Sequence, residues 1–178
     1  MSSYTIDLHT HRFAAWAAGR AASANGNRFS VEQGRAWLEA AGFDETFEVG
    51  ALPAPEKTDV THRTWRRTII RHAAKDAKEL SHGQAAKLIN VYLKARFVCG
   101  GFSKCPSVAA LHPPIDRVLL NRLIKTDFAG EKAIWRKARD TGWTKLSETE
   151  YEQLIKTLQQ TLRVTPLWMI EEHWQGHQ

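Results

Sequence analysis

Apolar residues recur along most of this chain with the spacing of an α-helix, and almost no stretch alternates with the period of two that a β-strand shows. Helix-capping signals separate the periodic segments, as at Ser30 with Gln33 and at Ser147 with Glu150. The pattern predicts an all-α fold, a compact bundle of about eight helices that forms a single domain over residues 1–178.

The predicted helices can be placed from their apolar stripes and their caps. The stretches 43–58 and 99–114 contain prolines and glycines and are predicted loops, and Asp127 is expected to cap the helix that follows it. The helices are predicted over residues 11–22, 31–42, 59–80, 82–98, 115–125, 128–139 and 148–163, with a short last one opening at Thr165-Pro166.

Composition narrows the class of protein. The 178 residues are 43% hydrophobic and 25% charged, which excludes a disordered or low-complexity chain, and the net charge of +6 favours polyanionic partners. Two cysteines, Cys99 and Cys105, are too few for a disulfide framework, a four-thiolate zinc site or an iron–sulfur cluster. We therefore expect a cytoplasmic protein without metal or other cofactor and without a membrane segment.

The segment 82–98 carries the first candidate chemistry. It is apolar nearly all round, so we expect it to run through the middle of the domain. Lys87, Asn90 and Lys94 interrupt that apolarity on one face. Near a helix start, the helix dipole and partial burial both disfavour an ammonium group, and a neutral amine is the form that attacks a sugar carbon. The alternative is that Lys87 and Lys94 extend to solvent along one wet stripe.

Asp116 is the second candidate. Pro113 and Pro114 hold the approach to it extended, so Asp116 reaches the first turn of an apolar helix with little conformational freedom. A carboxylate there accepts backbone N–H groups and stays ionised. An ordinary helix N-cap uses aspartate in the same way, so this residue alone does not identify a site.

Taken in chain order, the segments 83–91 and 114–118 resemble the helix-hairpin-helix DNA glycosylase superfamily, which includes endonuclease III and the 8-oxoguanine DNA glycosylases. In that family a glycine-containing hairpin leads into a helix that carries a catalytic lysine, and a Pro/Val-Asp dipeptide starts a later helix. Lys87 and Asp116 match these two positions. The resemblance covers roughly residues 80–125. The hairpin here has one glycine instead of two, and the interval between Lys87 and Asp116 is longer than usual.

The resemblance implies a glycosylase-like fold, with two lobes and a cleft near residues 80–126. It also implies binding of double-stranded, damaged DNA and excision of an oxidised or damaged base that has been flipped out of the duplex. In that chemistry Asp116 stabilises the charge that develops at the sugar C1′, and Lys87 attacks C1′. The resulting Schiff base allows strand scission by β-elimination, which is an AP lyase activity.

A basic stripe on the segment 59–80 is the predicted nucleic-acid surface. It lies about half a turn from the apolar stripe of the same helix, and its residues would hold phosphates, although a solvated face has the same pattern. The stripe consists of Arg63, Arg67, Arg71, Lys75 and Lys78, and Gly83 and Lys94 complete the predicted nucleic-acid-binding set.

Two other functions remain open at this stage. A non-catalytic nucleic-acid or protein-binding module of the same fold would have the same pattern. The spacing of Arg67 and His72 resembles the Arg-x4-His signature of HEPN ribonucleases, which would use these two residues to cut RNA in a dimer. Chance alone gives such a match in a chain with this much Arg and His.

The remaining histidines and tryptophans are given structural roles. The segment 9–11 has two histidines but no companions that would complete a metal site, so we expect a disordered terminal pair. His112 is expected to hydrogen-bond a loop carbonyl, and the alternative is that it faces the site. Core packing is expected for most of the tryptophans, although one of them could stack on a base: Trp135, Trp143, Trp168 and Trp174.

Overall fold

A computed structural model describes residues 4–24 and 27–176 of the chain, and this part is all-α, as predicted. Its only β feature is an isolated bridge between Ala24 and Asn27. The α-helices are α1 (Ile6–Ala22), α2 (Val31–Ala40), α3 (Thr58–Lys75), α4 (His82–Leu93), α5 (Pro106–Ala109), α6 (Arg117–Lys125), α7 (Lys132–Thr141) and α8 (Glu148–Leu162). A π-helix, η3 (Lys94–Phe102), continues α4, and the 3₁₀ turns are η1 (Val49–Ala51), η2 (Pro55–Lys57), η4 (Phe128–Gly130), η5 (Trp143–Lys145) and η6 (Leu167–His173).

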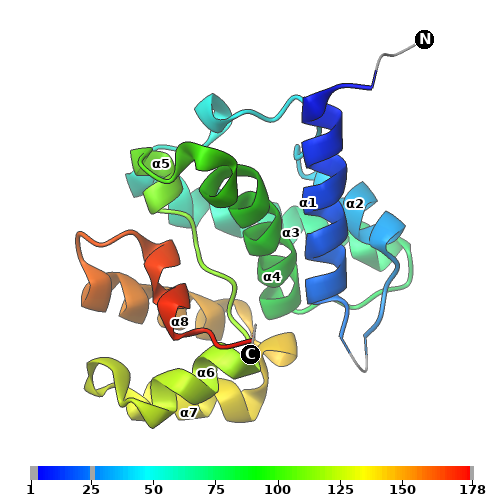
Figure 1. Cartoon of the computed structure of the whole chain (residues 1–178). Helices are drawn as coiled ribbons and strands as arrows, with labels where there is room; N and C mark the ends of the chain where they lie inside the picture. The colour runs from blue at the N-terminus through cyan, green and yellow to red at the C-terminus, as the bar shows by residue number, and fades with distance from the viewer. Residues whose placement is uncertain (1–3, 25–26, 177–178) are drawn as a thin grey trace.

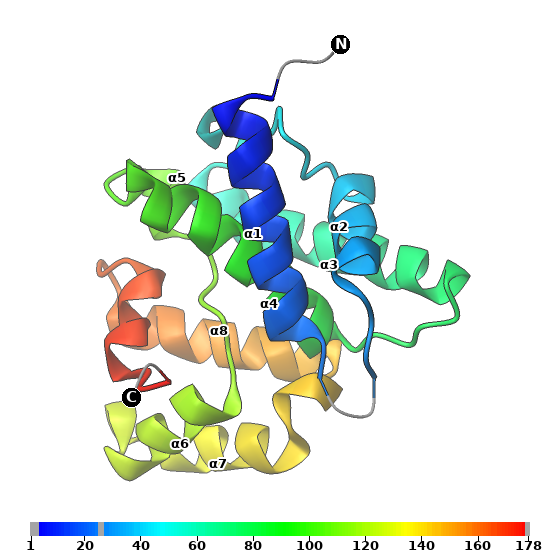
Figure 2. The same cartoon turned by 45° about the vertical axis from the view of Figure 1, so that its right-hand side comes forward.

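The helices pack around two hydrophobic clusters, one on each side of α4 (Figures 1 and 2). The first cluster is built mainly by α1, α2, α3 and α4, with Trp37 and Leu88 among its buried residues. The second is built mainly by α6, α7, α8 and η6, with Leu119 and Trp135 fully covered. Nearly all residues of α4 are buried, which confirms that this helix runs through the middle of the molecule.

The N-terminal helix begins earlier than the sequence pattern predicted. Thr5 caps α1 by accepting the Leu8 N–H, so the helix starts at Ile6 and includes the segment 9–11. The prediction of a disordered histidine pair is therefore wrong. His11 is buried, and its Nδ1 lies 2.9 Å from the Tyr92 hydroxyl of α4, which ties α1 to the central helix.

Three other predicted boundaries are corrected. Helix α3 ends at Lys75 and not at residue 80, because Ala77 takes a left-handed conformation with φ of 55°. Asp127 is itself left-handed and makes no side-chain cap, so α7 begins only at Lys132, after the turn η4. The predicted loop 99–114 contains the end of η3 and the short helix α5.

Gly83, in the first turn of α4, lies directly against the backbone of η5 and the residue that follows it. Its N–H donates to the Leu146 carbonyl at 3.1 Å. A Cβ at this position would lie 1.9 Å from the carbonyl oxygen of Trp143. Only glycine therefore allows α4 to pack against η5.

We predict that Gly83→Ala destabilises the protein by about 3 kcal/mol, because a backbone carbonyl cannot move aside as a flexible side chain would. Gly50→Ala is the matched control, since nothing lies within 4 Å of a Cβ built there, and it should change the stability by less than about 0.5 kcal/mol. Urea denaturation followed by far-UV circular dichroism measures both. Equal unfolding free energies for the two variants would contradict the close approach.

Candidate active site

Lys87 reaches the site from the central helix. The side chain of Ser81 caps α4 by accepting the Gln84 N–H, and Lys87 follows in the next turn. Its side chain is only 7% exposed, and its ammonium group lies 5.5 Å from the centre of the Trp143 ring of η5. The alternative prediction from the sequence, that the Lys87 side chain extends to solvent, is therefore wrong.

Asp116 meets Lys87 from the other side. Its Oδ1 accepts the Leu119 N–H at 2.9 Å, so it is the N-cap of α6, as the sequence indicated. Its Oδ2 accepts from Lys87 Nζ at 2.8 Å and from Trp174 Nε1 at 3.0 Å. The carboxylate is thus both a helix cap and one half of an ion pair, and its side chain is 18% exposed.

A buried polar network holds the approach to Asp116 against α4. Asn90 lies one turn after Lys87, and its Nδ2 donates to the Pro113 carbonyl at 2.9 Å and to the Tyr151 hydroxyl at 3.0 Å. Its Oδ1 lies 2.8 Å from His62 Nε2. Because Asn90 is 1% exposed, its bonds are expensive to break, and they fix the segment that carries Asp116.

His112 belongs to the same network. It is buried and lies 3.1 Å from the Tyr151 hydroxyl and 2.9 Å from an oxygen of Asp59. The expected bond to a loop carbonyl is therefore replaced by bonds to these two side chains. Burial lowers the pKa of His112 although Asp59 acts in the opposite sense, and burial also lowers the pKa of His62, to well below its usual range.

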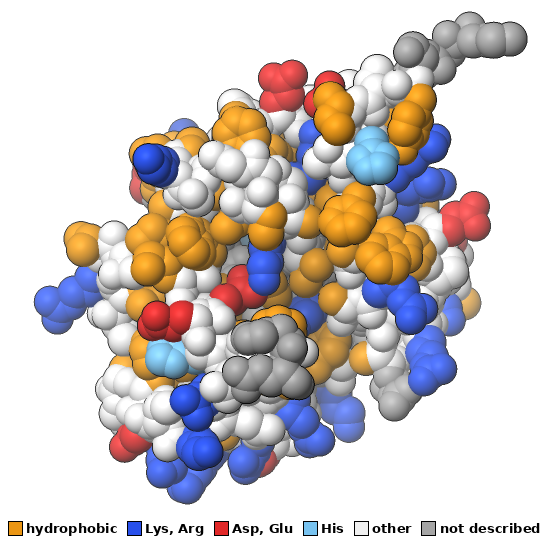
Figure 3. All heavy atoms as spheres, viewed as in Figure 1, with side chains coloured by type: hydrophobic (Ala, Val, Ile, Leu, Met, Phe, Trp, Pro, Cys, Tyr) orange, Lys and Arg blue, Asp and Glu red, His pale blue; other side chains and the backbone are white. Residues whose placement is uncertain are grey.

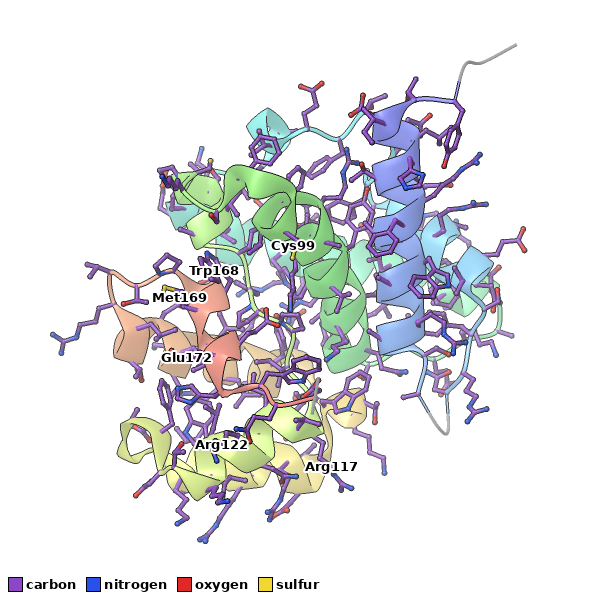
Figure 4. The ribbon with its side chains drawn as sticks, in the orientation of Figure 1. Cys99, Arg117, Arg122, Trp168, Met169 and Glu172 are labelled. Atoms are coloured by element: carbon purple, nitrogen blue, oxygen red, sulfur yellow. The ribbon has the colours of Figure 1, made fainter. Side chains whose placement is uncertain are left out.

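The Lys87–Asp116 pair opens onto a cleft of about 480 Å³, which we call the central cleft. This volume lies within the range of about 300–1,000 Å³ that is usual for ligand pockets. In Figure 3, acidic and basic side chains meet in a hollow near the centre of the face shown, and Figure 4 shows Cys99 on η3 and Glu172 on η6 on either side of this region. The lining residues are Ala17, Ala21, Lys87, Val91, Lys94, Ala95, Cys99, Pro114, Asp116, Trp143, Glu171 and Trp174.

A second ion pair lies in the central cleft. Lys94, two turns after Lys87 on α4, donates to Glu171 of η6, whose side chain is 15% exposed. The Lys94 ammonium also lies 5.8 Å from the centre of the Trp174 ring. Lys94 therefore faces the cleft and not an outer surface, and it stays a candidate for contact with a substrate that enters there.

The two carboxyl groups of the central cleft titrate differently. Burial alone would raise the pKa of Asp116, but the charge of Lys87 and the hydrogen bonds from Leu119, Lys87 and Trp174 outweigh it, so the pKa is lowered. For Glu171, burial dominates over the opposing effects of Lys94 and Lys87, and the pKa is raised. Asp116 is thus held ionised, whereas Glu171 takes up a proton more readily than an ordinary glutamate.

Most of the predicted nucleic-acid-binding residues lie away from the central cleft. Arg63 makes two bonds of 2.7 Å to Glu152 of α8, and Arg67 binds Glu148 of α8 in the same two-pronged way. These ion pairs neutralise much of the predicted basic stripe, in which Arg71 and Lys75 are exposed. Gly83 is buried and its N–H is already bonded to Leu146, so the predicted phosphate contact through this amide is corrected to a packing role.

Sequence reasoning missed Glu171, and it named Trp143 and Trp174 only among four tryptophans of which one could stack on a base. Glu171 and Trp174 lie in a C-terminal 3₁₀ segment and beside it, with no periodicity to mark them, and Trp143 follows a glycine turn. The abundance of tryptophan was the only signal, and it did not separate Trp143 and Trp174 from Trp135, which is buried in the second hydrophobic cluster. The His72 side chain is partly exposed on α3 and does not line the cleft.

Within the described ranges 4–24 and 27–176, no group of three or more His, Cys, Asp or Glu side chains is arranged to hold a metal ion. No helix in this part of the chain has both the length and the apolar character needed to cross a membrane. Comparison with protein-family models, with curated proteins and with solved structures finds no match to this chain.

The two ion pairs give a direct titration test. Lys87→Met should raise the pKa of Asp116, and Lys94→Met should raise the pKa of Glu171 further, because each substitution removes a positive charge and a hydrogen bond that lower the pKa of its partner. Carbon-13 NMR titration of the side-chain carboxyl groups measures both values in each variant. The pairing would be contradicted if Lys87→Met shifted the pKa of Glu171 more than that of Asp116. It would also be contradicted if Lys94→Met shifted the pKa of Asp116 more than that of Glu171.

Proposed function

We propose that this protein is a DNA glycosylase with associated AP lyase activity, which excises an oxidised or damaged base from DNA. The observation that supports it best is the 2.8 Å contact between Lys87 and Asp116 at the wall of the central cleft. These two residues are the ones that match the lysine and the aspartate of the helix-hairpin-helix glycosylases. A primary amine paired with a carboxylate in a concave site is also what nucleophilic attack on a sugar requires.

The first step uses the ion pair itself. Lys87 loses a proton to solvent water, which leaves a neutral amine with a free electron pair, and Asp116 Oδ2 stays ionised beside it. The amine attacks C1′ of the damaged nucleotide, the bond between C1′ and the base breaks, and the bonding electrons leave with the base. The departing base takes up a proton from water, and the ionised Asp116 stabilises the positive charge that develops at C1′ and then lies on the nitrogen bonded to it.

Strand scission follows from the covalent intermediate. The nitrogen loses one proton and its electron pair forms the C1′=N bond, while the bond between C1′ and O4′ breaks and O4′ takes up a proton. The opened sugar is then a protonated Schiff base between Lys87 and C1′, which withdraws electrons from C2′. A carboxylate of the central cleft, Asp116 or Glu171, removes a C2′ proton. The electrons of that C–H bond form a double bond to C3′, and the 3′ phosphate leaves with the electrons of its C–O bond.

The basic surface that would hold the DNA phosphates differs from the one first expected. Much of the α3 stripe is paired with α8, whereas basic side chains gather over the α6–α7 end of the molecule in Figure 3, where Figure 4 places Arg117 and Arg122 on α6. Lysines and arginines exceed acidic residues in 117–145: Arg117, Arg122, Lys125, Lys132, Arg136, Lys137, Arg139 and Lys145 against Asp127, Glu131 and Asp140. Affinity for DNA should therefore fall steeply with salt concentration.

Borohydride trapping tests the proposal. Wild-type protein incubated with duplex DNA that contains an abasic or oxidised site should give a covalent adduct on reduction, because sodium borohydride fixes the Schiff base. Lys87→Gln should abolish the adduct, and Asp116→Asn should slow its formation by roughly 100-fold. Gel electrophoresis of the labelled DNA measures the adduct.

Lys57→Gln is the matched control, since Lys57 is exposed in η2 outside the site, and it should trap as the wild type does. Far-UV circular dichroism checks that each variant is folded. Binding of DNA without any adduct would favour the non-catalytic module instead. Cleavage of RNA that is lost in His72→Ala would favour the ribonuclease.

A further inference from the structure

The solvent face of α1 carries a pair of exposed aromatic rings. Phe13 is 57% exposed and Trp16 is 52% exposed, and their ring centres lie 5.9 Å apart with an angle of 34° between the planes. The opposite face of α1 is buried in the first hydrophobic cluster through Ala14, Ala15 and Ala18. Two large aromatic residues that leave more than half of their surface in water contribute little to the core, so their exposure points to a ligand.

Basic residues flank this pair. Arg12 and Arg20 are both exposed on α1, and Arg20 lies one turn after Trp16. From Leu8 to the end of the helix at Ala22 the sequence has no Asp or Glu. We define the α1 aromatic surface as Arg12, Phe13, Trp16 and Arg20. The Arg12 guanidinium lies 5.5 Å from the centre of the Tyr4 ring. This combination of aromatic faces and positive charge complements a chain of bases and phosphates.

The α1 aromatic surface lies beside the central cleft. Ala17 and Ala21 line that cleft, and each directly follows a residue of the surface, Trp16 and Arg20 respectively. Figure 3 shows hydrophobic side chains gathered over α1 beside the central hollow. A strand whose damaged nucleotide entered the cleft would therefore pass its neighbouring nucleotides over these rings.

We propose that the α1 aromatic surface stacks an unpaired nucleobase of the DNA strand that enters the central cleft, while Arg12 and Arg20 bind the adjacent phosphates. The proposal rests on the proposed function and adds a substrate class to it: DNA in which the bases next to the lesion are unpaired, as in a single strand or a bubble. Every base has a flat face that can stack on an aromatic ring, so we expect the protein to prefer unpaired bases without a preference for their sequence.

Equilibrium binding with fluorescein-labelled oligonucleotides tests the proposal. Each oligonucleotide carries one reduced abasic site, either in a fully paired duplex or in a bubble of unpaired bases. The wild type should bind the bubble more tightly, and Trp16→Ala should weaken that binding by about tenfold while changing duplex binding by less than about threefold. Phe13→Ala should act in the same direction. Quenching of tryptophan fluorescence by the bubble should be reduced in Trp16→Ala.

Phe102→Ala is the matched control, because Phe102 is an exposed aromatic residue of η3, outside the α1 aromatic surface, and it should bind both oligonucleotides as the wild type does. Equal affinity of Trp16→Ala and the wild type for the bubble would overturn the proposal. Sedimentation that shows a wild-type dimer abolished by Trp16→Ala would also overturn it, in favour of a second copy as the occupant.

The two proposals fail in different ways. Trapping of DNA by both the wild type and Trp16→Ala, with unchanged affinity for the bubble, would overturn the stacking proposal alone. Absence of a trapped adduct in the wild type, together with weaker binding of the bubble by Trp16→Ala, would overturn excision and support the stacking surface.

Discussion

Burying a charged side chain costs free energy unless an opposite charge and hydrogen bonds compensate for the lost water. Lys87 and Asp116 are both largely buried, and their ion pair provides this compensation. The carboxylate receives three donors, from Lys87, Leu119 and Trp174, which come from α4, α6 and the C-terminal segment. The pair therefore joins the central helix to α6 and to the C-terminal segment, which both pack in the second hydrophobic cluster. Its geometry depends on the packing of all three, and it forms the polar wall of the central cleft.

The packing around this pair leaves little freedom. Asn90 fixes the proline segment in front of Asp116 to α4 through the Pro113 carbonyl, and it does so next to the aromatic rings of His62 and Tyr151, which lie stacked 5.6 Å apart. Gly83 lets η5 approach α4 closely, which brings Trp143 over Lys87. The nucleophilic role proposed for Lys87 requires this kind of support, because a shift of about 1 Å is enough to lose the alignment for attack.

The faces of the molecule differ in how far their positive charge is balanced by carboxylates. Arg63 and Arg67 of α3 are paired with Glu152 and Glu148 of α8 and act mainly within the protein. Positive charge that is less balanced by carboxylates gathers on α6 and α7 and on the outer face of α1, to the two sides of the central cleft. A polyanion attracted by this field would be drawn across the opening where Lys87 and Asp116 lie.

The sequence alone determined the helical class, the capping of α2, α6 and α8, and the central place of α4, because these follow from local periodicity and from hydrogen bonds within one turn. It also singled out Lys87 and Asp116, whose spacing and proline context are local signals. Only the tertiary structure decided that these two side chains touch, that Glu171 and Trp174 join them, and that Gly83 packs instead of binding phosphate. Contacts between segments far apart in the chain depend on the packing of whole helices, and no local pattern encodes which carboxylate meets which cation.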